Sequence, residues 1–360
     1  MKAVIIGAGL AGLTTALSLA PMPVIVLSAK KLGEGISSGW SQGGIAAAVG
    51  SHDTAQLHAA DTLKAGAGLS DASIARQVTE DGASIIDQLI NTGVNFDRDE
   101  EGRLRLGLEA AHSQRRIVHA AGDGTGAAIM KALIRAVKLM PSIEVIEDAC
   151  ASDILTHSGA VSGVLVEIKG KASIIPTNAV VLATGGAGAL WQHTTNPLSS
   201  WGQGLALAAR AGAVLGDLEF MQFHPTAIDC GRDPMPLASE ALRGEGALLI
   251  DENNQRFVDE LQPRDIVARA IWQHMQKGHR VFLDARQSIG SSFSKRFPSI
   301  YASCMTAHID PSLHPIPVRP AAHYHMGGVM TGAEGRSTVE GLWACGEVAC
   351  TGLHGANRLA

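Results

Sequence analysis

The sequence has little cysteine, few aromatic residues and no apolar run of the roughly 18 residues that a membrane span needs. Its five cysteines are odd in number and include no Cys-x-x-Cys pair, which argues against a disulfide framework and a zinc site, so we expect no metal. This content fits a reducing compartment, and we expect a cytoplasmic protein. The net charge of −5 includes no basic block or acidic tail, so nucleic acid and membrane surfaces are not expected partners. A small molecule is the better candidate.

Glycine, in contrast, is abundant. It provides 41 of the 360 residues, which exceeds the usual share of about 7%. We interpret this excess as a need for particular backbone conformations rather than for packing. A single hydrophobic core stops growing at about 250 to 300 residues, so a chain of this length is expected to form two domains.

The N-terminal segment has the pattern of a strand, a glycine turn and a helix. An apolar run at 3–6 precedes Gly-x-Gly-x-x-Gly at 7–12, and a helical segment at 13–19 leads to a second apolar run at 24–27. In such a turn the glycines permit tight folding, close approach of a pyrophosphate and close helix packing. The pattern predicts a parallel β-α-β unit that binds a dinucleotide. A glycine turn without a ligand and a secretory leader starting at Lys2 are the alternatives.

Other glycine clusters favour flavin over nicotinamide. The second strand ends in Ser28, where a carboxylate would bind the ribose of NAD. Residues 37–44 offer hydroxyls and backbone donors, although a flexible loop is the alternative, and 183–186 and 346–347 add further glycines. A nicotinamide domain is usually continuous, whereas these contacts come from the whole length of the chain. A flavin site assembled from both ends fits this distribution better.

The middle of the chain contains helices and short strands. Regular apolar spacing predicts helices at about 70–91, 124–139 and 263–275. From 144 to 182 the β-branched runs and the turns at 158–159 and 169–171 predict hairpins.

The composition changes after residue 216, where charge and proline increase. We therefore expect a first domain at 1–216, an inserted domain at 217–325 and a return to the first domain at 326–360.

Polar residues in apolar or glycine-rich settings suggest an anionic substrate. Two arginines, Arg264 and Arg358, and two histidines, His224 and His323, match a ligand with two carboxylates, because arginine binds carboxylates in bidentate fashion.

Simpler interpretations of these residues remain open at this point. His224 could be a satisfied core histidine, and Arg264 could form a helix-start ion pair with Asp265. The segment 112–116, which contains one histidine and two arginines, could be a solvated face.

The motifs together resemble one family of flavoproteins, the fumarate reductases, succinate dehydrogenases and L-aspartate oxidases. They run from the first strand to the last residues of the chain. They are Gly7 to Gly12, Gln42-Gly-Gly44, Gln222-Phe-His-Pro-Thr226, Arg243-Gly-Glu-Gly246, Pro263-Arg-Asp265, His323-Tyr-x-Met-Gly-Gly328 and His354-Gly-Ala-Asn-Arg358. The resemblance implies an α/β fold, with a Rossmann-like FAD-binding domain and an inserted α+β capping domain. The segment Glu109-Ala-Ala-His-Ser-Gln-Arg-Arg116 resembles the aspartate oxidase branch.

The resemblance also implies roles for individual residues. Arg264 would transfer the proton, with a relay through Glu240, Glu245 or Asp265, because free arginine stays protonated. The substrate would contact Glu109, Gln222, His224, Ser239, His323 and Arg358, with Glu109 meeting its ammonium group. The flavin contacts would be Gly7, Ala8, Gly9, Leu10, Ala11, Gly12, Lys30, Ser37, Ser38, Gly39, Trp40, Ser41, Gln42, Gly43, Gly44, Cys150, Ala151, Gln203 and Glu347.

Three positions depart from family patterns. Ser37 stands where respiratory members attach flavin covalently to a histidine, so FAD is expected to bind noncovalently. Gln203 stands where the family has an aspartate, which removes a charge near the flavin. Ser239 replaces a common threonine and keeps the hydroxyl.

The implied activity is oxidation of L-aspartate to iminoaspartate, with reoxidation of the flavin by oxygen or fumarate. Iminoaspartate would supply quinolinate and NAD synthesis, which implies a functional link to quinolinate synthase. A soluble fumarate reductase or succinate dehydrogenase-type flavoprotein is the nearest alternative. An inactive flavin-binding remnant is another, because family members continue beyond the position of Arg358 and we expect a chain truncated at Ala360.

Overall fold

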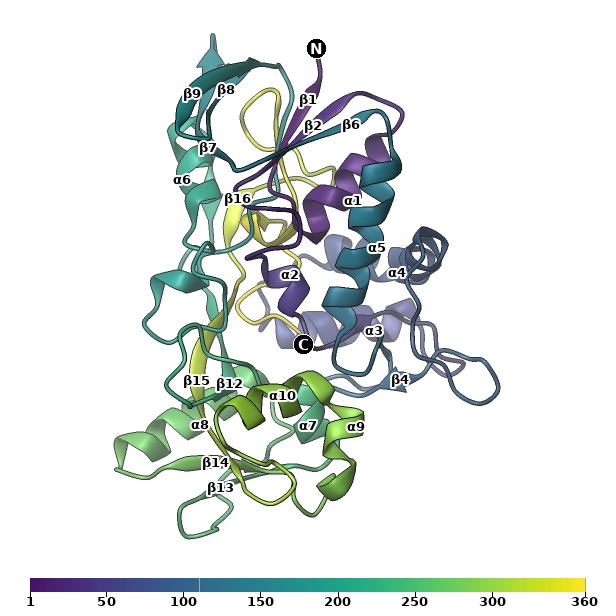
Figure 1. The fold of residues 1–360 in the computed structure, drawn as a ribbon, viewed down its shortest axis with the longest axis vertical. Helices are drawn as coiled ribbons and strands as arrows, with labels where there is room; N and C mark the ends of the chain where they lie inside the picture. The colour runs from purple at the N-terminus through teal and green to yellow at the C-terminus, as the bar shows by residue number, and fades with distance from the viewer. Residues whose placement is uncertain (110, 360) are drawn as a thin grey trace.

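The computed structural model describes residues 1–109 and 111–359, and its centre is a parallel five-stranded sheet (Figure 1). In spatial order the strands are β17 (Leu342–Ala344), β10 (Val180–Leu182), β1 (Ala3–Ile6), β2 (Val24–Ser28) and β6 (Ile143–Glu147). Residues from both ends of the chain therefore share one sheet, and β17 lies beside β10 in parallel register.

Both faces of this sheet are covered, which explains its nearly continuous apolar strands. Alternate residues of β1 and β2 enter different cores: Ile5 and Val26 pack with helices α1 (Leu10–Leu19) and α5 (Thr125–Leu139). Ile6 and Leu27 face the opposite core. The structure confirms a strand, turn and helix at the N-terminus, but α1 begins at Leu10, three residues earlier than expected.

An antiparallel three-stranded sheet contributes to the second core. It consists of β7 (Ala149–His157), β8 (Ala160–Ile168) and β9 (Lys171–Pro176). Both connections are the turns expected from the sequence, and Ser158 and Lys169 adopt positive φ there. The predicted hairpins are confirmed.

The first lobe contains further, smaller elements, some of which line the cavity described below. They are α2 (Ser37–Trp40), β3 (Ile45–Ala46), α3 (Ala55–Ala65), α4 (Ala72–Thr92), β4 (Leu106–Gly107), β5 (Ile117–Val118), α6 (Gln203–Arg210), β11 (Leu215–Gly216), β16 (Gly328–Met330) and β18 (Ala349–Cys350). The long helix α4 starts at Asp71, whose carboxylate accepts hydrogen bonds from two helix amides, and ends at Gly93 with φ 103°. This helix was predicted within two residues at each end.

A second lobe lies at the other end of the molecule in Figure 1 and has a core of its own. Its antiparallel sheet has the order β12 (Met221–Ile228), β15 (Ile316–His325), β14 (Val281–Asp284) and β13 (Leu248–Asp251). Its helices are α7 (Glu240–Gly244), α8 (Arg264–Gln276), α9 (Phe293–Arg296) and α10 (Pro298–Thr306). Strands β12 and β15 connect this lobe to the first one. The domain limits at 216 and 325 stay a prediction, and within the described residues no helix is long and apolar enough to cross a bilayer.

Candidate active site

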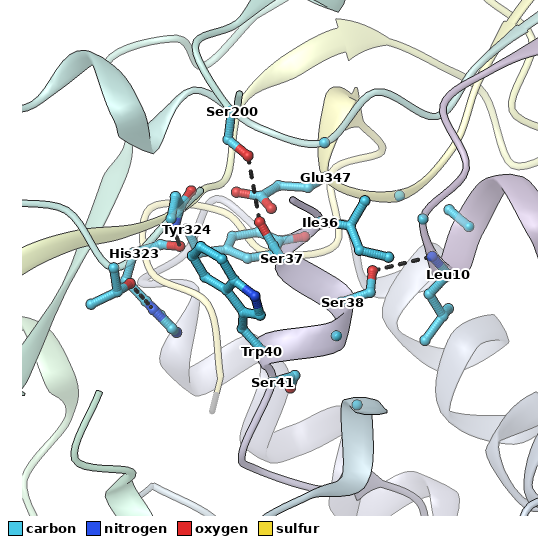
Figure 2. A pocket seen from close by; sticks show the side chains of 18 of the residues that line it. Leu10, Ile36, Ser37, Ser38, Trp40, Ser41, Ser200, His323, Tyr324 and Glu347 are labelled. Atoms are coloured by element: carbon cyan, nitrogen blue, oxygen red, sulfur yellow. Dashed lines mark hydrogen bonds between the residues drawn. The ribbon is translucent and has the colours of Figure 1, made fainter. Parts of the chain in front are cut away.

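A cavity of about 1260 Å³ is lined by residues of both lobes. It brings together most of the residues that the sequence predicted, including both ends of the flavin set and the arginines and histidines of the substrate set. Of the predicted residues, Gly12 and Gln222 do not line it. Figure 2 shows Ser37, Ser38 and Trp40 of α2 on one side, and His323, Tyr324 and Glu347 facing them.

The first glycine turn has the close approaches that its motif requires. A Cβ atom on Gly7, whose φ is 114°, would lie 2.2 Å from the Ala183 carbonyl oxygen, and one on Gly12 would lie 1.9 Å from the Gly7 carbonyl oxygen. Gly9 differs, because a Cβ there would meet only Ser38 Oγ, at 3.3 Å. Gly7 and Gly12 are therefore needed by the fold, whereas Gly9 leaves space that faces the cavity.

The polar groups around this turn fit an anionic dinucleotide. Helix α1 has no side-chain cap at Gly9, so the amides that follow Leu10 in its first turn are available to a phosphate. The amide of Leu10 donates to Ser38 Oγ at 3.1 Å, which holds α2 against this helix end (Figure 2). Two further cavity-lining atoms, Gln42 Oε1 and Thr184 Oγ1, are buried without a hydrogen-bond partner in the described part of the chain. These residues therefore fit FAD.

Glu347 and Gln203 complete this end of the cavity. Glu347 Oε1 accepts a hydrogen bond from the His325 amide at 2.9 Å, and burial raises the pKa of this carboxyl to about 7. Gln203 donates through Nε2 to the Ala151 carbonyl oxygen at 2.9 Å and to Cys150 Sγ at 3.3 Å. Gln203 thus holds the start of β7 at Cys150 and Ala151, the two residues of this strand that were predicted to contact FAD.

We expect Gly9→Ala to fold normally but to lose most of its FAD. The added methyl group has space in the protein and would occupy the position from which a pyrophosphate approaches the turn. Gly12→Ala is the contrasting variant, because its methyl group collides with backbone and should prevent stable folding. Thermal unfolding and the ratio of flavin to protein absorbance measure both effects. Full flavin content in folded Gly9→Ala would contradict this placement of the phosphates.

The substrate end of the cavity contains two histidines that can act as neutral donors. His224 is buried, and its Nδ1 accepts from the Thr226 amide at 3.2 Å, so Nε2 carries the proton. His224 Nε2 has no partner among residues 1–109 and 111–359 and belongs to a cavity-lining side chain. Burial, followed by the nearby Arg264 charge, lowers the pKa of His224 and of His323. The two rings lie 5.0 Å apart. Because its Nε2 has no partner in the described residues, His224 is not a satisfied core histidine.

Ser239 and Arg358 add donors to the same space. Ser239 precedes α7 and accepts from the Ala241 amide at 3.3 Å, which leaves its hydroxyl hydrogen available. Arg358 lies 4.5 Å over the ring of Tyr324, and its Nη1 is buried without a partner in the described residues. Tyr324 Oη lies 3.3 Å from His354 Nε2. The unpaired donors of Arg358 and His224 would be costly unless an anion accepts from them.

Arg264 lies at the start of α8 and makes three side-chain contacts. Its Nε donates to Glu240, its Nη1 donates to Gln222 Oε1 at 3.0 Å, and its Nη2 lies 3.8 Å from Glu109 Oε2. It does not pair with Asp265, which instead accepts from Arg269 at 2.5 Å. Of the three relay candidates, Glu240 is the one in contact with Arg264, and it also lies 3.2 Å from Arg243 Nη2.

Gln222 lies behind the cavity wall and connects the two arginines. Its Nε2 donates to Arg358 O at 2.7 Å and to Asn357 Oδ1 at 2.9 Å, while its Oε1 accepts from Arg264. Both amide hydrogens of Gln222 are used in these bonds, so in this structure it positions the two arginines, and its contact with the substrate stays a prediction.

Glu109 supplies a carboxylate close to the arginines of the pocket. Its side chain is 6% exposed and lines the cavity. Burial, followed by the nearby Glu240 carboxylate, raises the pKa of Glu109. An ammonium group of a ligand would compensate this buried carboxylate.

Comparisons with known proteins agree with this geometry. Residues 2–360 match the family model described as an FAD binding domain. The chain is 58% identical to the L-aspartate oxidase of Mesorhizobium japonicum over an alignment of 362 positions that covers 99% of this chain and 71% of that protein. The chain belongs to the FAD-binding domain family and, within it, to the L-aspartate oxidases. The L-aspartate oxidase of Bacillus subtilis is 44% identical, with coverage of 99% and 68%.

The fold of this chain is also similar to solved structures of related flavoproteins. The quinol fumarate reductase FrdA of E. coli has a TM-score of 0.93 and 30% identity, and covers 99% of this chain. The Sdh1 complex of Mycobacterium smegmatis has a TM-score of 0.84 and 30% identity. This chain spans 66% and 64% of those two chains. The predicted α/β FAD-binding fold is confirmed, and FAD is the cofactor of the family.

Several residues that shape this oxidase-type site were not singled out by sequence reasoning. Tyr324 and Asn357 lie inside recognised motifs but received no role, and Thr195 supports His323 Nδ1 at 2.8 Å. The segment 112–116 is also different from the solvated face considered above. Arg116 is completely buried and His112 nearly so, whereas Arg115 is exposed.

Proposed function

We propose that this protein oxidises L-aspartate to iminoaspartate with noncovalently bound FAD, and uses oxygen or fumarate as final electron acceptor. The observation that carries this proposal is the position of Glu109, a buried carboxylate that lines the cavity 3.8 Å from Arg264, together with His224, His323 and Arg358. L-aspartate supplies an ammonium group that can pair with Glu109, whereas a dicarboxylate without an amino group leaves Glu109 only its longer contact with Arg264.

The residues of the chain bind and orient the substrate. Arg358, His323, His224 and Ser239 donate to its two carboxylates, and Glu109 receives its ammonium group. Orienting the reacting groups in this way can lower the activation free energy by several kcal/mol. The chemistry that FAD supplies when bound is acceptance of a hydride equivalent.

The proton leaves through the second lobe. Arg264 is the cavity-lining group in contact with a further carboxylate, Glu240, which in turn contacts Arg243. Because Arg264 is a protonated guanidinium, it can accept the substrate proton only as its Nε passes a proton to the Glu240 carboxylate along the existing hydrogen bond. The guanidinium is then unchanged, and the proton ends on Glu240.

The product has a defined metabolic use in this proposal. Iminoaspartate would be consumed in quinolinate formation, the first stage of NAD synthesis from aspartate, which implies a functional link to a quinolinate synthase. Fumarate fits the same carboxylate donors, so reduction of fumarate is the second activity that the pocket supports.

Glu109→Gln tests the choice between these substrates. We expect kcat/KM for L-aspartate to fall by about a hundredfold, as for loss of a buried charge partner, while fumarate reduction changes little because fumarate has no ammonium group. Glu101→Gln, an exposed glutamate that pairs with Arg103, is the matched control. The measurement is flavin bleaching by L-aspartate under anaerobic conditions, and flavin reoxidation by fumarate. Equal losses with both substrates would contradict the proposed role of Glu109.

A further inference from the structure

The loop that carries Glu109 is attached to helix α3 by a buried ionic cluster, which we define as Asp53, Asp61 and Arg116. Arg116 is 0% exposed. Its Nε and Nη2 donate to the two carboxylate oxygens of Asp53 at 2.8 and 2.9 Å. Its Nη1 donates to Asp61 Oδ2 at 2.7 Å. All three nitrogens of the guanidinium are therefore engaged.

The same Asp61 oxygen holds a second point of the loop. Ser113 donates to Asp61 Oδ2 through its amide at 2.9 Å and through its hydroxyl at 2.8 Å. Despite burial, these hydrogen bonds and Arg116 lower the pKa of Asp61, which remains a carboxylate. Helix α3 thus holds the loop at two positions that follow Glu109.

Glu109 is connected directly to these attachment points. The His112 amide donates to the Glu109 carbonyl oxygen at 3.3 Å, and Ala111 adopts φ 68°, a conformation that a residue with a side chain takes only when its surroundings impose it. On the other side, β4 pairs with β5 immediately around the loop. The backbone of Glu109 is consequently fixed from both directions.

The cluster does not take part in the site itself. Asp53, Asp61, Ser113 and Arg116 do not line the cavity. Burying three charges costs desolvation energy, so a cluster of this kind is an inefficient source of stability, but it defines one geometry because each charge needs its partners. A loop that only had to pack could use apolar residues instead.

We propose that Asp53, Asp61 and Arg116 are positioning residues that hold Glu109 in place, and thereby set the preference for a dicarboxylate with an ammonium group over one without. This inference rests on the proposed function, in which Glu109 receives the ammonium group. Loss of the cluster should weaken binding of L-aspartate but not of fumarate. The donors to the carboxylates, Arg358, His323 and His224, belong to other segments of the chain and would stay in place.

Arg116→Lys tests the proposal in the full-length chain with FAD bound. Lysine keeps the charge but cannot bind two carboxylates through three fixed nitrogens. We expect kcat/KM for L-aspartate to fall by about 10- to 100-fold, mainly through KM, because displacement of a positioned group by an ångström has effects of this size. Fumarate reduction should stay within about threefold. Arg115→Lys is the matched control, since Arg115 is exposed one residue earlier.

Ser113→Ala provides an independent variant that leaves all charges in place. It removes one hydrogen bond to Asp61 and should shift the aspartate-to-fumarate ratio of kcat/KM in the same direction by a smaller factor. Equal losses with both substrates, with a lowered melting temperature, would show a purely structural role and overturn the inference. An unaltered protein that reduces fumarate but does not oxidise aspartate would overturn the proposed function and, with it, this inference.

Discussion

Arg264→Lys is expected to lower the rate of flavin reduction by L-aspartate about a thousandfold, the usual range for loss of a general acid or base. The guanidinium donates to Glu240 and Gln222 and approaches Glu109 at the same time. A lysine ammonium is a point charge on a flexible stem and cannot keep these contacts together. Bound FAD should be unaffected, because Arg264 belongs to the second lobe.

Rapid mixing under anaerobic conditions measures this rate directly. Arg269→Lys is a suitable control, since Arg269 lies on the same helix, is exposed and pairs with Asp265 outside the cavity. Flavin reduction within tenfold of the unaltered protein would remove Arg264 from the proton-transfer role and leave Glu240 to be tested in its place.

Arg358→Met is expected to raise KM for L-aspartate and for fumarate alike, by about 100- to 1000-fold, because removal of one partner from a buried charged contact costs about 3 to 4 kcal/mol and each 1.4 kcal/mol is tenfold. Arg358 presents an unpaired buried Nη1 to the site and is held over the Tyr324 ring. Both substrates have the carboxylate that it would bind. The equal effect on both distinguishes Arg358 from Glu109, whose removal should affect aspartate alone.

Initial rates with each substrate, and flavin content as a check of folding, measure this effect. Arg336→Met is the matched control, because Arg336 is exposed and lies over Trp343 away from the cavity. A KM change below tenfold for both substrates would mean that the two histidines and Ser239 suffice to hold the carboxylates.

Local sequence patterns predicted the N-terminal β-α-β unit, the hairpins and α4 closely, because each depends on residues near one another in sequence. The predicted start of α1 lies three residues too late, because the glycine motif has the pattern of a turn up to Gly12. In the structure Gly12 is already helical and packs against the Gly7 carbonyl oxygen. A glycine at a crowded contact looks the same in sequence as a glycine in a turn.

The candidate site was predictable in composition but not in its contacts. The arginines and histidines were recognisable from their motifs, whereas the partner of Arg264 had three candidates until packing placed Glu240 against it. The environment of Arg116 was missed for a related reason. Its partners Asp53 and Asp61 lie 63 and 55 residues away in sequence, so no local pattern could show that this arginine is buried.

The amide of Gln222 has a consequence for how the cavity could open. It joins Arg264 of the second lobe to the backbone of Arg358, which belongs to the segment following β18. Separation of the second lobe from this segment would break the bonds that Gln222 Nε2 donates to Arg358 O and Asn357 Oδ1, at a cost of about 1 to 3 kcal/mol for amide hydrogens left without acceptors. We therefore expect a substitution of Gln222 that removes these bonds to change the rate of product release, although Gln222 does not line the cavity.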